Sequence, residues 1–315
     1  MTSGEERAVP VPDGERLEFD EARARELEEH YDPEIRFRPL APGAGYLVGG
    51  LLVVLSLFHY YTAGFGLLQE TMHRGIHLSF VLGLIFLVFP ASRRGYTQPA
   101  EAGLLRPLGI GLPDWILAIV AVVAVMHIPL IPLDDLAFRV GNPTMLDVVL
   151  GGLLILVLLE ATRRSLGVPL PIIALIFMAY ALWGPHMPGI LVHPGASFPQ
   201  LVDHLYLTTQ GIYGVALGVV ATYVFHFVLF GVFATRIGLG QLFLDCAAWV
   251  AGRYAGGPAK VSIFGSALFG MISGSSVANT VTVGSLTIPA MIRLGYNRNF
   301  AAAVEATAST GGQIT

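Results

Sequence analysis

The residues best suited to chemistry in this sequence are neutral, oxygen-bearing side chains grouped inside an apolar stretch. They lie at positions 273 to 280, with Gly274 among them, and are Ser273, Ser275, Ser276, Asn279 and Thr280. Hard cations prefer oxygen ligands of this kind. The group therefore predicts half of an ion and substrate site, and sodium is a fitting ion.

A second polar group ends an alanine-rich run that starts at Phe300. Its members are Ser309, Thr310, Gly311, Gly312 and Gln313. A helix that begins at membrane depth offers free N–H groups to an anion, and one that ends there offers free C=O groups to a cation. We expect a helix break here that faces the first group across the site.

Titratable side chains are missing from the stretch between positions 261 and 292. Carriers driven by protons usually place such groups within the membrane. Their absence favours sodium over a proton as the coupling ion. Glu305 is the one acid nearby. Two structural roles, an ion pair with Arg298 or a place at the helix start, are at least as favoured for it as ion binding.

The composition is that of a membrane protein. Of the 315 residues, 54% are hydrophobic and 13% are charged, against about 25% charged in a soluble domain. Of the 22 acidic residues, 12 fall within the first forty positions, so a charged tail precedes an apolar body. No basic surface suggests nucleic acid binding. The only cysteine, Cys246, is expected to be a buried small hydrophobe.

Six apolar runs approach the roughly 17–25 residues that a membrane-spanning helix needs. They are Gly45–Tyr61, Ile76–Phe89, Trp115–Leu133, Met145–Leu159, Val168–Trp183 and Val215–Ala234. Pro129 and Pro132 should bend or end the third. Basic residues gather in alternate loops, which places the N-terminus in the cytoplasm. The sequence thus predicts an all-α, multi-pass protein of the cell inner membrane.

A seventh apolar run, Val261–Ile292, carries basic residues at both ends. Lys260 precedes it, and Arg293 and Arg298 follow it. Two full crossings would need about 40 residues, so a re-entrant hairpin of two half-length helices fits better. Its polar middle must be buried in protein or line a cavity. The alternative, that its small residues only let helices pack closely, stays open.

Other polar residues inside the apolar body receive structural interpretations. Glu160 and Asp147 are expected at opposite ends of one helix, and His226 is expected in a hydrogen bond between helices. His73 and His77 have a spacing that two metal ligands could use. We place them in a loop and do not expect a metal there.

Several motifs resemble the membrane permease of tripartite ATP-independent periplasmic (TRAP) transporters. The similarity is greatest to the TAXI-type branch, in which the small and large membrane subunits are fused. It covers nearly the whole chain, and the motifs that carry it most specifically are Gly270–Asn279, Gly284–Met291 and Ala308–Gln313.

The resemblance implies an elevator-type carrier in which a periplasmic binding protein delivers an organic anion, typically a carboxylate, and a sodium gradient drives uptake. Residues 1–40 would be a cytoplasmic tail, 41–165 a four-helix domain similar to the small subunit, and 166–315 the start of the large subunit. Carried over by position, one sodium site would be formed within the two polar groups, with oxygens from Ser273, Ser275, Asn279 and Thr310.

The chain is expected to hold only the first of the family's two inverted repeats. It would then be an N-terminal half, a fragment or a truncated reading frame, unable to transport alone.

Two other classes of function were weighed against transport. A non-transporting assembly subunit suits the first four spans but not the polar hairpin. An intramembrane serine protease would use Ser275 or Ser276 as its nucleophile, and a base must activate such a serine. No histidine follows His226 in the sequence, so this base would have to be His226 or an earlier histidine. No enzyme activity and no cofactor other than a coupling ion are expected.

Overall fold

The computed structural model describes residues 37–92, 106–273, 276–311 and 314, and it contains helices and turns without any strand in these ranges. The chain divides into two compact units: Glu34–Phe230 forms one, and the other includes Gly231–Thr315. The all-α fold is therefore confirmed. The proposed tail lies almost wholly outside the described residues, and the three domain boundaries stay predictions.

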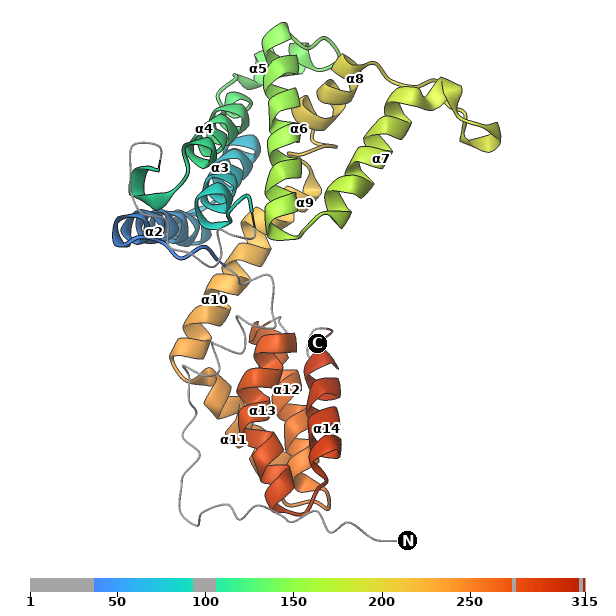
Figure 1. The fold of residues 1–315 in the computed structure, drawn as a ribbon. Coiled ribbons are helices and arrows are strands. Elements are labelled where there is room, and N and C mark those ends of the chain that lie inside the picture. The colour runs from blue at the N-terminus through green and yellow to red at the C-terminus, as the bar shows by residue number, and fades with distance from the viewer. Residues whose placement is uncertain (1–36, 93–105, 274–275, 312–313, 315) are drawn as a thin grey trace. The chain divides into compact units, whose positions relative to one another are not determined.

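The Glu34–Phe230 unit is a bundle of helices (Figure 1). Its helices are α2 (Pro42–Phe65), α3 (Glu70–Val88), α4 (Leu112–His127), α5 (Leu133–Arg139), α6 (Met145–Ser165), α7 (Pro169–Trp183), α8 (Phe198–Val202) and α9 (Val215–Val219). A π-helical turn, η7 (Val220–Val224), joins α9 to α10 (Phe225–Arg236). Proline in the first turn starts α2, α4 and α7, where no intrahelical N–H donor is lost.

Five helical segments are long and apolar enough to cross a membrane. They are Pro42–Phe65, Glu70–Val88, Met145–Ser165, Pro169–His186 and Val215–Ala234. The third expected span, Trp115–Leu133, is shorter than predicted: its helix, α4, has 16 residues and ends at His127. Pro129, two residues later, cannot donate the backbone hydrogen bond that would extend the helix.

The apolar faces of these helices support a lipid environment. Only 11% of the α7 window is buried within the protein, and Leu170, Ile173 and Phe177 on this helix are exposed. An extensive exposed apolar surface marks contact with lipid or with another protein.

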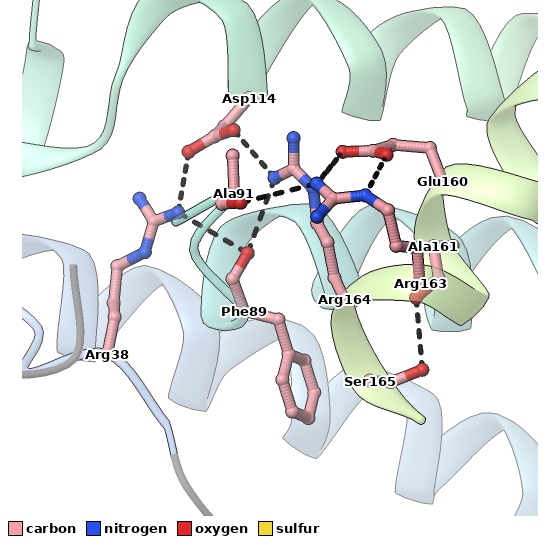
Figure 2. A network of polar contacts seen from close by, with 9 residues as sticks. All are labelled: Arg38, Phe89, Ala91, Asp114, Glu160, Ala161, Arg163, Arg164 and Ser165. Atoms are coloured by element: carbon pink, nitrogen blue, oxygen red, sulfur yellow. Dashed lines mark hydrogen bonds and ion pairs between the residues drawn. The ribbon is translucent and has the colours of Figure 1, made fainter. Parts of the chain in front are cut away.

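A network of charged groups ties together three helices and the segment that precedes α2 (Figure 2). The guanidinium of Arg164 donates to Asp114 Oδ1 at 2.7 Å, to Glu160 Oε1 at 2.7 Å and to the Phe89 carbonyl at 3.3 Å. Arg38 donates to the other oxygen of Asp114 at 2.5 Å. The Arg164 side chain is 3% exposed, so it brings together groups from α4, α6 and the end of α3. The expected position of Glu160 near one end of α6 is confirmed.

Asp147 organises the opposite end of α6. Its carboxylate accepts from the backbone N–H of Thr144 at 2.9 Å, and the Thr144 hydroxyl in turn accepts from the Asp147 N–H, which makes a capping box. His127 at 2.7 Å and Arg139 at 3.2 Å also donate to it. Asp147 therefore starts α6 and ties it to α4 and α5, and its expected place at the helix end is confirmed.

Two buried tyrosines fix the end of α4. Tyr206 donates its hydroxyl hydrogen to the Ala124 carbonyl at 2.5 Å, and Tyr213 donates to the Val125 carbonyl. The last carbonyl groups of a helix have no partner within it. These two hydroxyls supply partners there and anchor the chain between α8 and α9.

Histidine and cysteine positions required correction. His73 and His77 lie on α3 and not in a loop, because α3 begins earlier than the apolar run does. His77 contacts His59 at 2.9 Å between ring nitrogens, and His226 donates to the His59 carbonyl, which confirms the expected helix–helix bond. Within the described ranges, no three histidine, cysteine or acidic side chains are arranged to hold a metal ion. Cys246 lies on α11 (Leu239–Ala251), on a face of that helix that is exposed, so the expectation that it is buried is wrong.

Candidate functional site

The predicted hairpin is formed by α12 (Gly257–Ser273) and α13 (Ser276–Arg293), which pack side by side (Figure 1). With α11 (Leu239–Ala251) and α14 (Arg298–Gly311) they make up a small helical bundle. Leu244, Phe269 and Val283 form its apolar core. α12 is described as far as Ser273 and α13 from Ser276. Residues 274 and 275, at the interruption predicted within Ser273–Asn279, lie outside the described residues.

The two hairpin helices are longer than expected. They contain 17 and 18 residues, whereas half-length helices would contain about 10. Most of the difference lies within the apolar run itself, which supplies 13 residues of α12 and 17 of α13, while α12 adds four residues back to Gly257 and α13 adds only Arg293. The helical hairpin is thus an observation, and its re-entrant topology in the membrane stays a prediction.

Asn279 lies in the first turns of α13 and is fully buried. Its Nδ2 donates to the Ser266 carbonyl on α12 at 2.8 Å, which fixes the orientation of the amide because a carbonyl can only accept. Its Oδ1 is also buried and has no hydrogen-bond partner among the described residues. A buried acceptor without a donor costs about 1–3 kcal/mol. An oxygen in this state fits a cation ligand.

Glu305 lies at the centre of the bundle, among hydroxyl groups that were not predicted from the sequence. The side chain is fully buried on α14. Four hydroxyl groups surround its carboxyl oxygens: Ser262 at 2.6 Å and Thr287 at 2.5 Å from Oε2, and Ser266 at 2.8 Å and Ser309 at 2.9 Å from Oε1. No basic side chain of the described chain forms an ion pair with it. The expected pairing with Arg298 is wrong, since Arg298 is exposed.

The Glu305 cluster, defined as Glu305 with its four hydroxyl partners, connects the two predicted motifs. Ser266 accepts from Asn279 through its backbone carbonyl and donates to Glu305 through its hydroxyl. Ser309 donates to the same carboxyl from the second motif. One residue of each predicted group therefore belongs to a single hydrogen-bonded network. Spacing could have indicated part of it, because Ser262 and Ser266, and likewise Glu305 and Ser309, are one helical turn apart.

The remaining predicted residues lie apart from this network. Thr280 donates to the Ser276 carbonyl and Thr310 to the Ala306 carbonyl, each at 2.8 Å within its own helix. Thr310 and Gly311 are exposed at the end of α14. Ser273 closes α12. Gly274, Ser275, Gly312 and Gln313 lie outside the described residues.

Gly284 makes room for the Glu305 carboxyl chain, and this permits a prediction. A Cβ added at position 284 would lie 2.9 Å from Glu305 Cγ and 3.3 Å from Ile288 Cδ1. We expect Gly284→Ala to destabilise the protein by about 1–3 kcal/mol, the usual effect of overpacking a core. Thermal unfolding of the purified protein would measure it. Gly45→Ala is the matched control, because a Cβ added at Gly45 would have no atom within 4 Å. Gly295→Ala would not serve, because the φ of +91° at Gly295 would strain an alanine there. Equal melting temperatures for Gly284→Ala and the wild type would contradict the packing described.

Comparison with known proteins identifies the family. The family model described as "Tripartite ATP-independent periplasmic transporter, DctM component" matches residues 153–315. The chain belongs to this family. The matched region includes α7 and the whole of the hairpin bundle, so the Glu305 cluster and Asn279 are part of a TRAP permease domain.

Individual relatives agree with this assignment. A C4-dicarboxylate TRAP transporter large permease protein DctM of Rhodobacter capsulatus is 35% identical over 86 residues, covering 27% of this chain and 20% of the relative. The isethionate TRAP transporter permease protein DctMQ of Oleidesulfovibrio alaskensis is 41% identical over 86 residues, covering 27% and 14%. The DctM protein of Vibrio cholerae is 28% identical over 159 residues, covering 50% and 32%.

The chain spans a third or less of these TRAP permeases. No solved structure matches it significantly. The relatives are named as transporter permeases, which agrees with the expectation of a transport component and not an enzyme. The resemblance drawn from the sequence motifs is therefore confirmed at the level of the TRAP permease family.

Proposed function

We propose that this chain is the permease component of a sodium-coupled secondary transporter that imports organic acids handed over by a periplasmic substrate-binding protein. Membership of the TRAP permease family supports a transport role. The relatives whose names mention C4-dicarboxylate and isethionate support small organic anions as the substrate class. The apolar spans place the chain in a lipid bilayer, for which we propose the inner membrane with the N-terminus in the cytoplasm.

One observation supports the ion site: Asn279 Oδ1, near the start of α13, is buried and has no hydrogen-bond partner among the described residues. Ser273, Ser275, Asn279 and Thr310 would supply the oxygen ligands of sodium. The substrate would lie against the rest of the two polar groups, which are Gly274, Ser276, Thr280, Ser309, Gly311, Gly312 and Gln313. The hairpin would be re-entrant and part of a moving transport domain.

The physical basis of this site is the meeting of helix ends. Free backbone groups at a helix break present partial charges, positive at a helix start and negative at a helix end. A transporter site at such a break can hold an anionic substrate and a cation close together, so that each stabilises the other. This arrangement would make the affinity for the organic anion depend on sodium.

We expect Asn279→Ala to lower the apparent sodium affinity of uptake about tenfold, or about 1.4 kcal/mol, because one inner ligand oxygen is lost. The measurement is uptake of labelled C4-dicarboxylates by the complete permease in proteoliposomes with its binding protein, at several sodium concentrations. Asn299→Ala, at an exposed position on α14, is the matched control.

Two results would contradict the proposal at different levels. Uptake that is unchanged without sodium, or that needs ATP, would refute a sodium-coupled carrier. Uptake that keeps its sodium dependence in Asn279→Ala would leave the carrier standing and refute the site.

A further inference from the structure

The carboxyl group of Glu305 carries no compensating charge in the described part of the chain. The basic residues of the three helices around it are Lys260 on α12, Arg293 on α13 and Arg298 on α14, and all three are exposed. On α11, Asp245 is exposed and bonded to Gln241. A fully buried carboxylate without a cation is strongly disfavoured, so such a group either binds a cation or takes up a proton.

Hydrogen counting at Thr287 shows how each protonation state of Glu305 would be hydrogen-bonded. Its Oγ1 lies 3.0 Å from the Val283 carbonyl and 2.5 Å from Glu305 Oε2. A threonine hydroxyl has one hydrogen, and the Val283 carbonyl can only accept. If Thr287 donates to Val283, the hydrogen between Thr287 and Glu305 must come from a protonated carboxyl. If Thr287 donates to Glu305, the carboxyl can be ionised.

Both protonation states therefore satisfy the same set of atoms. The ionised carboxylate accepts four hydroxyl hydrogens, two at each oxygen. The neutral acid keeps three of these, from Ser262, Ser266 and Ser309, and donates its own proton to Thr287 Oγ1. The change requires one hydroxyl rotation and leaves no buried polar group of the cluster unpaired. The four hydroxyl groups occupy the four lone-pair sites of the ionised carboxylate.

We propose that the Glu305 cluster is a proton-binding site of this permease, which takes up and releases one proton in the core of the hairpin bundle. The proton comes from solvent water and bonds to Oε2. On release this O–H bond breaks, the proton returns to solvent water, and the Thr287 hydroxyl turns from the Val283 carbonyl to donate to Oε2, so the charge of the cluster changes by one. Ser266 contacts both groups, since its hydroxyl donates to Glu305 and its backbone carbonyl accepts from Asn279. The link between protonation and transport rests on the proposed function, but proton binding itself does not.

The test is infrared difference spectroscopy of the purified permease in lipid nanodiscs, titrated over the range in which protein carboxyls change state, roughly pH 3 to 9. The wild type should show a carbonyl band of a protonated, buried carboxyl that disappears as the pH rises. Glu305→Gln, which mimics the neutral acid in shape and hydrogen bonding, should lack this band. Asp245→Asn removes an exposed acid and should keep it.

A second variant protects the test against a folding failure. Thr287→Val removes the hydroxyl that bonds the carboxyl in both states, and hydrogen bonds to an ionised group are the stronger ones. The band should then persist to higher pH than in the wild type.

Three results would overturn the proposal. They are a spectrum identical in Glu305→Gln and wild type, a band that does not change between the two ends of the titration, and a carboxylate band that shifts on adding sodium at constant pH. The last would assign the cluster to a metal cation. None of these readouts depends on uptake. They can therefore be interpreted even if transport proves to be independent of sodium.

Discussion

Replacing Arg164 with methionine is expected to destabilise the Glu34–Phe230 unit by about 3–5 kcal/mol, as removal of one partner of a buried ion pair does. The substitution leaves Asp114 and Glu160 without their shared guanidinium and the Phe89 carbonyl without a donor. It also removes the contact of the guanidinium with the Phe86 ring, 5.0 Å from the ring centroid. Denaturant unfolding of the detergent-solubilised protein, followed by tryptophan fluorescence, would measure the loss.

The neighbouring arginine provides the control for this experiment. Arg163 also bonds Glu160, at 2.7 Å, but its side chain is 40% exposed where that of Arg164 is 3% exposed. Arg163→Met should therefore cost no more than about 1 kcal/mol, the range of exposed pairs. Equal losses for the two variants would show that burial does not set the strength of this network.

The second large effect is expected at the other end of α6. Asp147→Ala should cost about 3–5 kcal/mol, because it leaves His127, Arg139 and the Thr144 N–H without their common acceptor in a fully buried position. It also removes the capping box, so the start of α6 should lose order. Hydrogen–deuterium exchange followed by mass spectrometry would show faster exchange at the first turns of α6.

An exposed acid on the adjacent helix is the matched comparison for Asp147. Asp134 lies in the first turn of α5 and is exposed. Asp134→Ala should change the free energy of unfolding by less than about 1 kcal/mol, through loss of its interaction with the helix dipole alone. Unchanged exchange at α6 in Asp147→Ala would contradict the assigned role of the carboxylate.

Features that depend on local patterns were predictable from the sequence. Apolar runs of bilayer length located five spans, since length and composition decide whether a helix can cross lipid. Pro129 ended α4 as expected, because proline blocks the next backbone hydrogen bond. The apolar run between two basic flanks predicted a helical hairpin, and α12 and α13 form it.

The Glu305 cluster could not be found in this way, because three helices supply it. Its partners Ser262 and Thr287 are 43 and 18 residues away in sequence, and no periodicity links them. The expected pair with Arg298 could have been rejected on geometry alone. Residues seven apart on a helix are separated by about 10 Å along the axis, which is too far for an ion pair.

The preference for sodium was based on the hairpin's own residues, and the structure qualifies that reasoning. The hairpin has no acid of its own, but α14 brings Glu305 against Ser262, Ser266 and Thr287 of the hairpin helices. The sequence placed Glu305 near the hairpin but could not show that its carboxyl group lies against the hairpin helices. Sodium at Asn279 and a proton at Glu305 are separate sites in the resulting proposal.

The length of α12 has an electrical consequence. From Lys260 to Ser273 the helix rises about 20 Å, or two thirds of a hydrocarbon core of about 30 Å. In the re-entrant topology proposed for the hairpin, a cation at its tip would thus be separated from the basic flank by most of the membrane potential. The energy of one elementary charge would differ by about 1.5 kcal/mol between the tip and the basic flank at 100 mV. A potential that is negative on the basic side would therefore pull the ion inward from the tip, whatever the concentration gradient.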